Sequence, residues 1–239
     1  MKFIIVIPAR YNSSRLPGKP LIKIKGIPMI KRTYLQCLKV VDKEKIIIAT
    51  DDQRIMNYCK TENINSIMTS KKCLTGTDRI AEVAKKIKAK FYVNVQGDEP
   101  ICNPLDLKKL IIKASENTND IINGYTEIKD TKLFFSPHIP KVAFRKDGRL
   151  LYQSRAPIPF NKKKKFVKSW RQVCIYSFPY KALMKFASLK KKTPFEEIED
   201  CELIRFLELG YEIKLIKMSN KSISVDTKDD LKKVSKLIN

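Results

Sequence analysis

Three cations follow a short apolar segment near the amino terminus. Residues 3–7 are apolar and mostly β-branched, Pro8 follows them, and Arg10, Arg15 and Lys19 come soon afterwards. A short apolar run that ends at proline predicts a buried strand. Cations at the carboxyl end of such a strand lie where open α/β sheets bind ligands. Together with the backbone N–H groups of the loop they suit a polyphosphate, and a solvated basic loop is the alternative.

Two carboxylates stand at positions that suit a metal ion. Asp98 follows the strand predicted over residues 90–95, and Asp226 opens the last predicted helix. Mg²⁺ prefers oxygen ligands and often takes one or two carboxylates together with phosphates and water. The alternatives are a turn residue for Asp98 and a helix N-cap for Asp226.

Other chemistries lack their residues. A G-x-G-x-x-G fingerprint is absent, and Pro20 follows Gly18-Lys19, so neither a dinucleotide-binding unit nor a Walker A loop is supported. His138 is the single histidine, so no Ser-His or Cys-His pair forms without it. The six cysteines form no CxxC pair, which disfavours zinc.

The formal net charge of +24 raises the question of nucleic-acid binding. Arg accounts for only ten of the 49 basic residues, and the lysines are scattered over nearly every predicted helix. No zinc finger or aromatic RNA-binding signature accompanies them. We therefore interpret the charge as a general lysine bias at solvated positions, whose field still steers anionic substrates inward.

Strands and helices alternate through the first half of the chain, which predicts an α/β fold with a mostly parallel central sheet covered on both faces. Strands are predicted over residues 3–7, 45–50, 65–68 and 90–95, and helices over 28–40, 79–88 and 103–115. The rhythm changes near residue 120, where strands over 120–128, 141–145, 150–153 and 172–178 predict a mixed or antiparallel insertion. Helices over 179–188, 194–209 and 227–238 and a strand over 212–218 complete the prediction.

No signal peptide or membrane-spanning segment is predicted, because the opening apolar run is short and Pro8 and Arg10 follow it. We expect a cytoplasmic protein whose cysteines are reduced thiols.

Six sequence blocks resemble one enzyme family over almost the whole chain. The blocks are PARYNSSRLPGKPL at 8–21, ATD at 49–51, TGTDRIAEV at 75–83, VNVQGDEP at 93–100, LYQSRAPIP at 151–159 and VDTKDDL at 225–231. They resemble the sugar-acid cytidylyltransferases, and most closely the 3-deoxy-manno-octulosonate (Kdo) cytidylyltransferase, or CMP-Kdo synthetase, family.

This resemblance implies a Rossmann-like nucleotidyltransferase fold, with residues 1–239 as a single domain and an insertion at about 120–180 that contributes to a homodimer. It implies a Mg²⁺-dependent attack by the anomeric hydroxyl of a 3-deoxy-2-ulosonic acid on the α-phosphate of CTP, with release of pyrophosphate. The CMP-sugar would serve lipopolysaccharide or another surface glycan. Neither nucleic acid nor a membrane is an implied partner.

The resemblance also implies residue roles. Lys19, Asp98 and Asp226 would be catalytic, and the two aspartates would bind Mg²⁺. The residues implied for the nucleotide are Pro8, Ala9, Arg10, Arg15, Lys19, Thr77, Arg79 and Gln96. Those implied for the sugar acid are Gln96, Arg155, Tyr176, Glu202 and Arg205, where an arginine suits the carboxylate.

Two positions depart from the family pattern near the expected sugar pocket. Gln172 stands where the family pattern has a histidine, and Leu203 stands where it has a glutamine. These changes predict that a variant acid, such as an 8-amino or nine-carbon relative, is used faster than Kdo itself. An alternative of a different class is a basic nucleic-acid-binding protein on a degenerate enzyme fold. The retained residues Arg10, Lys19, Asp98 and Asp226 argue against it.

Overall fold

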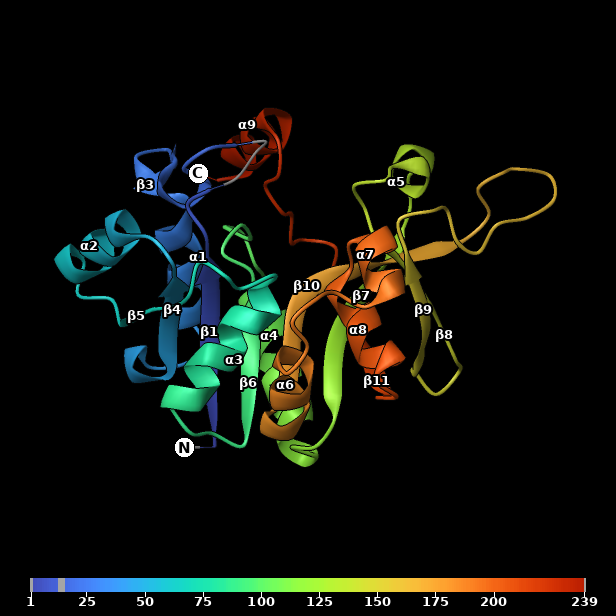
Figure 1. The fold of residues 1–239 in the computed structure, drawn as a ribbon. Coiled ribbons are helices and arrows are strands. Elements are labelled where there is room, and N and C mark those ends of the chain that lie inside the picture. Colours follow the sequence, from blue (N-terminus) through green and yellow to red (C-terminus); the bar gives the residue numbers. More distant parts are fainter. Residues whose placement is uncertain (1, 13–15, 239) are drawn as a thin grey trace.

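The computed structural model describes residues 2–12 and 16–238, and nine strands of this part of the chain form one sheet (Figure 1). The main path runs β11-β7-β10-β6-β1-β4-β5, and β8 and β9 continue outward from β10. The strands are β1 Phe3–Ala9, β4 Ile46–Thr50, β5 Ser66–Met68, β6 Phe91–Val95, β7 Ile121–Ile128, β8 Lys141–Phe144, β9 Leu150–Ser154, β10 Ser169–Pro179 and β11 Ile213–Lys217.

The predicted mostly parallel sheet is confirmed. Strand β1 pairs in parallel with β4 and β6, β4 with β5, and β7 with β11. Strand β10 is antiparallel to both of its neighbours on the main path, β6 and β7. The segment expected as an insertion is therefore partly built into the sheet, because β7 and β10 lie between β6 and β11, and only β8 and β9 extend beyond it (Figure 1).

Helices cover both faces of the sheet because the buried strands carry apolar residues on both sides. In β1, Ile5 and Ile7 pack with α1 (Met29–Leu38), α2 (Gln53–Thr61) and α4 (Pro104–Glu116). The alternating residues Ile4 and Val6 pack with α3 (Gly76–Lys86), α6 (Tyr180–Ala187) and α8 (Glu202–Glu208). This period of two is the expected side-chain alternation along a strand.

A third, smaller core docks the end of the chain onto its beginning. Helix α9 (Lys228–Leu237) packs through Val234 near the short β2–β3 hairpin (Lys23–Ile24 and Ile27–Pro28). The backbone N–H of Val225 donates to the carbonyl of Asp98 at 2.9 Å. The segment before α9 is thereby fixed against the loop after β6, and Figure 1 shows α9 above the upper edge of the sheet.

The single helix expected over residues 194–209 is wrong. The structure has two helices, α7 (Pro194–Glu199) and α8, with Asp200 between them in a left-handed conformation at φ 47°. A short helix, α5 (Thr131–Phe135), and the 3₁₀ turns at Lys19–Leu21 and Lys43–Lys45 were also not predicted. These elements are short, and short segments carry little periodic signal.

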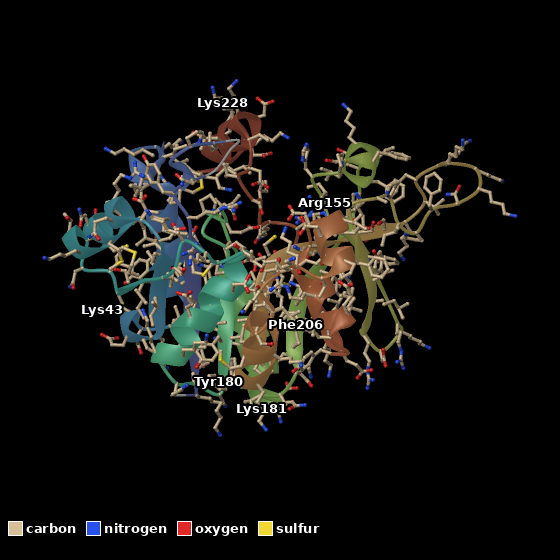
Figure 2. All side chains as sticks on the ribbon, viewed as in Figure 1. Lys43, Arg155, Tyr180, Lys181, Phe206 and Lys228 are labelled. Atoms are coloured by element: carbon tan, nitrogen blue, oxygen red, sulfur yellow. The ribbon has the colours of Figure 1, made fainter. Side chains whose placement is uncertain are left out.

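Three further observations concern the predictions about membrane segments, cysteines and charge. No helix in the described part of the chain is long and apolar enough to cross a membrane. The six cysteines all lie within that part and are free thiols. Lysines are spread widely, and the labelled Lys43, Lys181 and Lys228 lie on three different sides of the molecule (Figure 2).

Candidate active site

A cavity of about 250 Å³ lies at the carboxyl ends of β1 and β6. The starts of α3 and α8 and the segment before α9 also contribute to its wall. Its lining residues are Pro8, Ala9, Arg10, Lys19, Pro20, Cys73, Leu74, Thr75, Gly76, Arg79, Gln96, Gly97, Asp98, Glu196, Asp200, Cys201, Glu202 and Asp226. This is the edge at which open α/β sheets bind ligands.

The ammonium group of Lys19 joins two carboxylates in this cavity. Its Nζ lies 2.6 Å from Oδ2 of Asp98 and 3.1 Å from Oδ1 of Asp226. The three side chains are 15%, 24% and 31% exposed, so the cluster is partly shielded but open to a ligand. Burial by itself lowers the pKa of Lys19, but the two carboxylates outweigh it and the pKa is raised, so Lys19 is a cation at neutral pH.

Two glycines allow the backbone to approach this closely. Gly18 has φ +68°, a left-handed conformation that glycine adopts without strain, and its N–H donates to the carbonyl of Tyr11 at 3.1 Å. A Cβ added to Gly97 would lie 2.7 Å from the carbonyl oxygen of Pro8. Glycine at position 97 therefore lets the loop after β6 pack against the end of β1, which brings Asp98 beside Lys19.

The capping alternative for Asp226 does not hold. Thr227 is the N-cap of α9, and it forms a capping box with Asp230. Asp226 stands one residue before the cap, and its carboxylate is directed to Lys19 instead. At the start of α2 the N-cap is Asp52, which accepts the N–H of Arg54 at 2.9 Å.

Asp98 and Asp226 fit a hard divalent cation. The ammonium group between them acts as a stand-in for such an ion, because it draws both carboxylates to one point of positive charge. Within the described residues no group of three or more His, Cys, Asp or Glu side chains could hold a metal. A Mg²⁺ ion on this pair would thus complete its coordination with phosphate oxygens and water, as Mg²⁺ commonly does.

The residues expected at the nucleotide mostly line the cavity. Pro8, Ala9, Arg10 and Gln96 do so, and Arg79 does so while its Nη2 pairs with Asp51 at 2.9 Å. Arg15 lies outside the described residues.

Thr77 does not line the cavity. It is fully buried in the first turn of α3, where its hydroxyl donates to Glu202.

The carboxylate of Glu202, the first residue of α8, binds the amino terminus of α3. Its carboxylate accepts the backbone N–H of Gly76 at 3.2 Å and that of Thr77 at 2.9 Å. A carboxylate at a helix amino terminus is favoured by the helix dipole and satisfies N–H groups that lack helical partners. Burial raises the pKa of Glu202, and the hydrogen bonds from Thr77 oppose this shift.

Arg205 does not face the cavity, which corrects its expected contact with a sugar carboxylate. Its side chain is fully buried and forms a two-point ion pair with Glu196, at 2.6 Å from Nε and 2.7 Å from Nη2. Its Nη1 also donates to Oδ1 of Asp78 at 3.1 Å. Arg205 therefore joins α8 to α7 and to the capping residues of α3.

Arg155 and Tyr176, also expected at the sugar, are not among the residues that line the cavity. The guanidinium of Arg155 donates to the carbonyls of Glu199 at 2.7 Å and of Pro137 and Asp200 at 3.0 Å. Figure 2 shows Arg155 beside α7. The hydroxyl of the buried Tyr176 accepts the Nε2 of Gln172 at 2.7 Å.

The two departures from the family pattern are also placed away from the cavity. Leu203 is 1% exposed and packs in the core with Phe178 and Phe206. Gln172 is held between Gln153 and Tyr176. The expectation that both positions border the sugar pocket is therefore wrong for Leu203 and without support for Gln172.

Several lining residues were missed from sequence. The helix is interrupted between α7 and α8, and this brings three residues into the cavity wall, Glu196, Asp200 and Cys201. The capping box of Thr193 and Glu196 marks only the start of α7, which was predicted, and not the break at Asp200 that forms this wall.

The chain belongs to the cytidylyltransferase family, whose sequence model matches residues 4–217. Among its relatives, the 3-deoxy-manno-octulosonate cytidylyltransferase of Geotalea daltonii is 37% identical over 98% of this chain and 97% of the relative. The enzyme of the same name from Chlamydia pneumoniae is 38% identical over 98% of this chain and 92% of the relative. A solved structure of CMP:2-keto-3-deoxy-manno-octonic acid synthetase complexed with CTP has a TM-score of 0.91 and 33% identity, and covers 100% of this chain and 98% of that one.

Proposed function

We propose that this enzyme transfers CMP from CTP to the anomeric hydroxyl of 3-deoxy-manno-octulosonate and releases pyrophosphate. The observation that carries the proposal is the meeting of Lys19, Asp98 and Asp226 in one cavity at the carboxyl ends of β1 and β6. Relatives with the named activity support the sugar, since they are similar over nearly the full length of both chains. The placement of Leu203 in the core removes one reason to prefer a variant acid.

The cations and carboxylates divide the reaction between them. Arg10 and Lys19 would hold the triphosphate, and Arg15 would join them from the same loop. Asp98 and Asp226 would hold Mg²⁺, which when bound neutralises developing charge and lowers the pKa of the attacking hydroxyl. Phosphoryl transfer of this kind needs mostly positioning and electrostatic stabilisation, and the residues of the cavity are suited to both.

Two polar side chains of the cavity, Gln96 and Glu202, could bind sugar hydroxyls. Gln96 supplies both a donor and an acceptor, and Glu202 is held in place by the amino terminus of α3. We assign these two residues to the sugar. Arg155 and Tyr176 would support the surrounding wall through their hydrogen bonds to neighbouring segments.

The test is release of pyrophosphate from CTP in the presence of Mg²⁺ and a panel of ulosonic acids. The panel contains Kdo, its 8-amino analogue and a nine-carbon ulosonic acid, each at the same CTP and Mg²⁺ concentrations. The proposal predicts the highest kcat/KM with Kdo and little turnover when ATP or GTP replaces CTP. A clearly higher kcat/KM with another acid would replace Kdo as the substrate, and no turnover with any acid would overturn the proposal.

We further propose a homodimer that works in the cytoplasm and supplies a CMP-sugar for a surface polysaccharide. The dimer is supported by exposed apolar side chains in the loop between β9 and β10, where Phe160 is 53% exposed and Val167 is 78% exposed. Sedimentation analysis of the wild type beside a Phe160→Ser, Val167→Ser double variant tests this, with the variant expected to shift toward monomer. If the wild type and the double variant are both dimers, the interface lies elsewhere. If both are monomers, the dimer is excluded.

A further inference from the structure

The connecting segment between β11 and α9, residues 218–227, is irregular, yet it brings Asp226 to the cavity. Since helical or strand hydrogen bonds do not set its path, other contacts must do so. Three serines of the connecting segment supply them, Ser219, Ser222 and Ser224. Two of these serines bind the beginning of α4, and the third binds the loop that carries Asp98.

The first two serines fix the early part of the connecting segment. The carboxylate of Asp106 accepts the backbone N–H of Ser219 at 3.1 Å and its hydroxyl at 2.5 Å. The hydroxyl of Ser222 accepts the backbone N–H of Asn103 at 3.2 Å. These contacts hold the connecting segment against α4 but do not reach the loop after β6.

The third serine makes that connection. The hydroxyl of Ser224 donates to Oε1 of Glu99, the residue that directly follows Asp98. Glu99 is 3% exposed. Its backbone lies in a tight turn, where its N–H donates to the carbonyl of Gln96 at 3.1 Å and its carbonyl accepts the N–H of Cys102 at 3.0 Å. Glu99 is therefore an acceptor with a fixed position, against which the connecting segment is placed.

We infer that Glu99 and Ser224 are positioning residues of the metal site. Their hydrogen bond holds the two proposed metal ligands at the spacing that a divalent cation needs. Glu99 is next to Asp98, and Ser224 stands two residues before Asp226. Between them the N–H of Val225 donates to the carbonyl of Asp98 at 2.9 Å, so a side-chain bond and a backbone bond join the same two segments. This inference rests on the proposed function for the metal, and it concerns the residues that fix the ligands.

The surroundings of this hydrogen bond suit a positioning role. Glu99 and Ser224 are 125 positions apart in the sequence, so local geometry cannot set the distance between the segments that carry them. The thiol of Cys174 on β10 borders the pair, with its Sγ 3.8 Å from Oγ of Ser224. A hydrogen bond enclosed in this way is strengthened by the low local dielectric. Removing groups that hold metal ligands in place typically lowers metal affinity by about tenfold to a hundredfold.

The experiment measures Mn²⁺ binding to the enzyme in the presence of CTP and without sugar, from the electron paramagnetic resonance signal of free Mn²⁺. CTP binds Mn²⁺ to the same extent in every sample, and Asp98→Asn gives the level without one proposed ligand. We expect Ser224→Ala to bind Mn²⁺ at least about tenfold more weakly than the wild type. Glu99→Leu should act similarly, and the double variant should add little, because both changes remove one hydrogen bond.

Two control variants separate positioning from stability and from charge. Ser222→Ala removes a hydrogen bond of the same connecting segment, so thermal stability should fall as it does in Ser224→Ala, while Mn²⁺ affinity stays near the wild-type value. Glu99→Gln keeps an oxygen that can accept the Ser224 hydroxyl, so it should also keep the affinity.

Folded Ser224→Ala protein that binds Mn²⁺ as tightly as the wild type overturns the inference. An equal weakening in Ser222→Ala or in Glu99→Gln also overturns it, since general loosening or lost charge would then be the cause. Circular dichroism checks folding, and Ser224→Ala carries the test if Glu99→Leu does not fold. If the wild type binds Mn²⁺ no better than Asp98→Asn, the metal site of the proposed function fails and the inference falls with it. None of these results depends on the sugar, since no turnover is measured.

Discussion

Residues 3–116 and residues 121–218 use their polar side chains in different ways. In the first region, β1 and β6 run in parallel and end at the same edge, so Arg10, Gln96 and Asp98 all reach the cavity. In the second region β10 runs against its neighbours, and the polar residues bind one another. Arg205 pairs with Glu196, and Tyr176 accepts a hydrogen bond from Gln172.

This difference separates a reactive edge from a supporting wall. Arg10, Lys19 and Asp98 of the first region meet in a cavity that is partly exposed, whereas Arg205 of the second region is closed into a buried network with Glu196. Glu202 joins the two regions, because it lies on α8 but binds the amino terminus of α3. Chemistry is therefore expected to fail first when the first region is altered, and stability when the second is.

The largest effect is expected from Arg205→Met. The change leaves Glu196 buried without its ion-pair partner, and breaking such a pair typically costs about 3–5 kcal/mol. Urea unfolding should show this loss of stability, while KM for the sugar in the folded enzyme stays near the wild-type value. The exposed Arg149→Met serves as the control and should unfold like the wild type. A raised KM with unchanged stability would instead place Arg205 at the sugar.

Lys141, a buried residue of the second region, allows a test by pH. It is fully buried, its ammonium donates to the carbonyls of Ser136 and Arg155, and burial followed by the charge of Arg155 lowers its pKa to about 8. Glu199 and Cys201 oppose this shift.

From pH 8 upward the unfolded chain keeps the Lys141 proton that the folded chain releases, so stability should rise with pH. The gain between pH 8 and pH 10 is about 2.7 kcal/mol at most. Below pH 8 both states are protonated and the contribution is constant. The measurement is the difference in unfolding free energy between the wild type and Lys141→Met across this range. Parallel pH profiles would contradict the lowered pKa.

Asp98→Asn tests the reactive edge. The side chain keeps its shape but loses the charge that would hold Mg²⁺, so kcat should fall at least about a hundredfold with nearly unchanged thermal stability. Removal of Mg²⁺ by EDTA should act on the wild type in the same direction. Asp52→Asn is the matched control, because asparagine also caps a helix and kcat should be unaffected. Full activity of Asp98→Asn would exclude the two-carboxylate site.

The smallest effect is expected from Gln172→His, which restores the family pattern at a position outside the cavity. Its kcat/KM for Kdo should stay within about threefold of the wild type, since the effect must pass through Tyr176.

Leu203→Gln should chiefly reduce stability, by about 1–3 kcal/mol, because it buries an amide in the core. A gain in kcat/KM above tenfold in either variant would return that position to the sugar pocket.

The position of a site residue could be predicted from the sequence where it depends on a strand and the loop that follows it. The ends of β1 and β6 located Arg10, Lys19 and Asp98 correctly, because a buried strand and its following loop can be recognised from a few residues. The placement of Asp226 depended on Val225, which binds the backbone of Asp98 from the far end of the chain. Only the family resemblance favoured Asp226 as a partner of Asp98 over its alternative role as a helix cap.

The error for Arg205 arose because the sequence did not show which side chains of the helix expected over 194–209 face the cavity. A continuous helix over 194–209 gave no reason to separate Glu202 from Arg205, which lie on neighbouring positions of one helical face. In the structure both residues lie on α8 and both contact α3, and the break at Asp200 folds α7 back so that Glu196 pairs with Arg205. A left-handed residue that is not glycine carries no clear signal in a single sequence.

The antiparallel strand β10 also delays completion of the sheet while the chain emerges from the ribosome. Strand β6 emerges early, yet its second edge pairs only with β10, after β7, β8 and β9 have been synthesised. An unpaired inner strand is a site for wrong association until its partner arrives. Asp226 emerges later still, so a nascent chain carries Asp98 long before the pair exists. The Asp98–Asp226 pair therefore forms only after the segment before α9 has been synthesised and has docked.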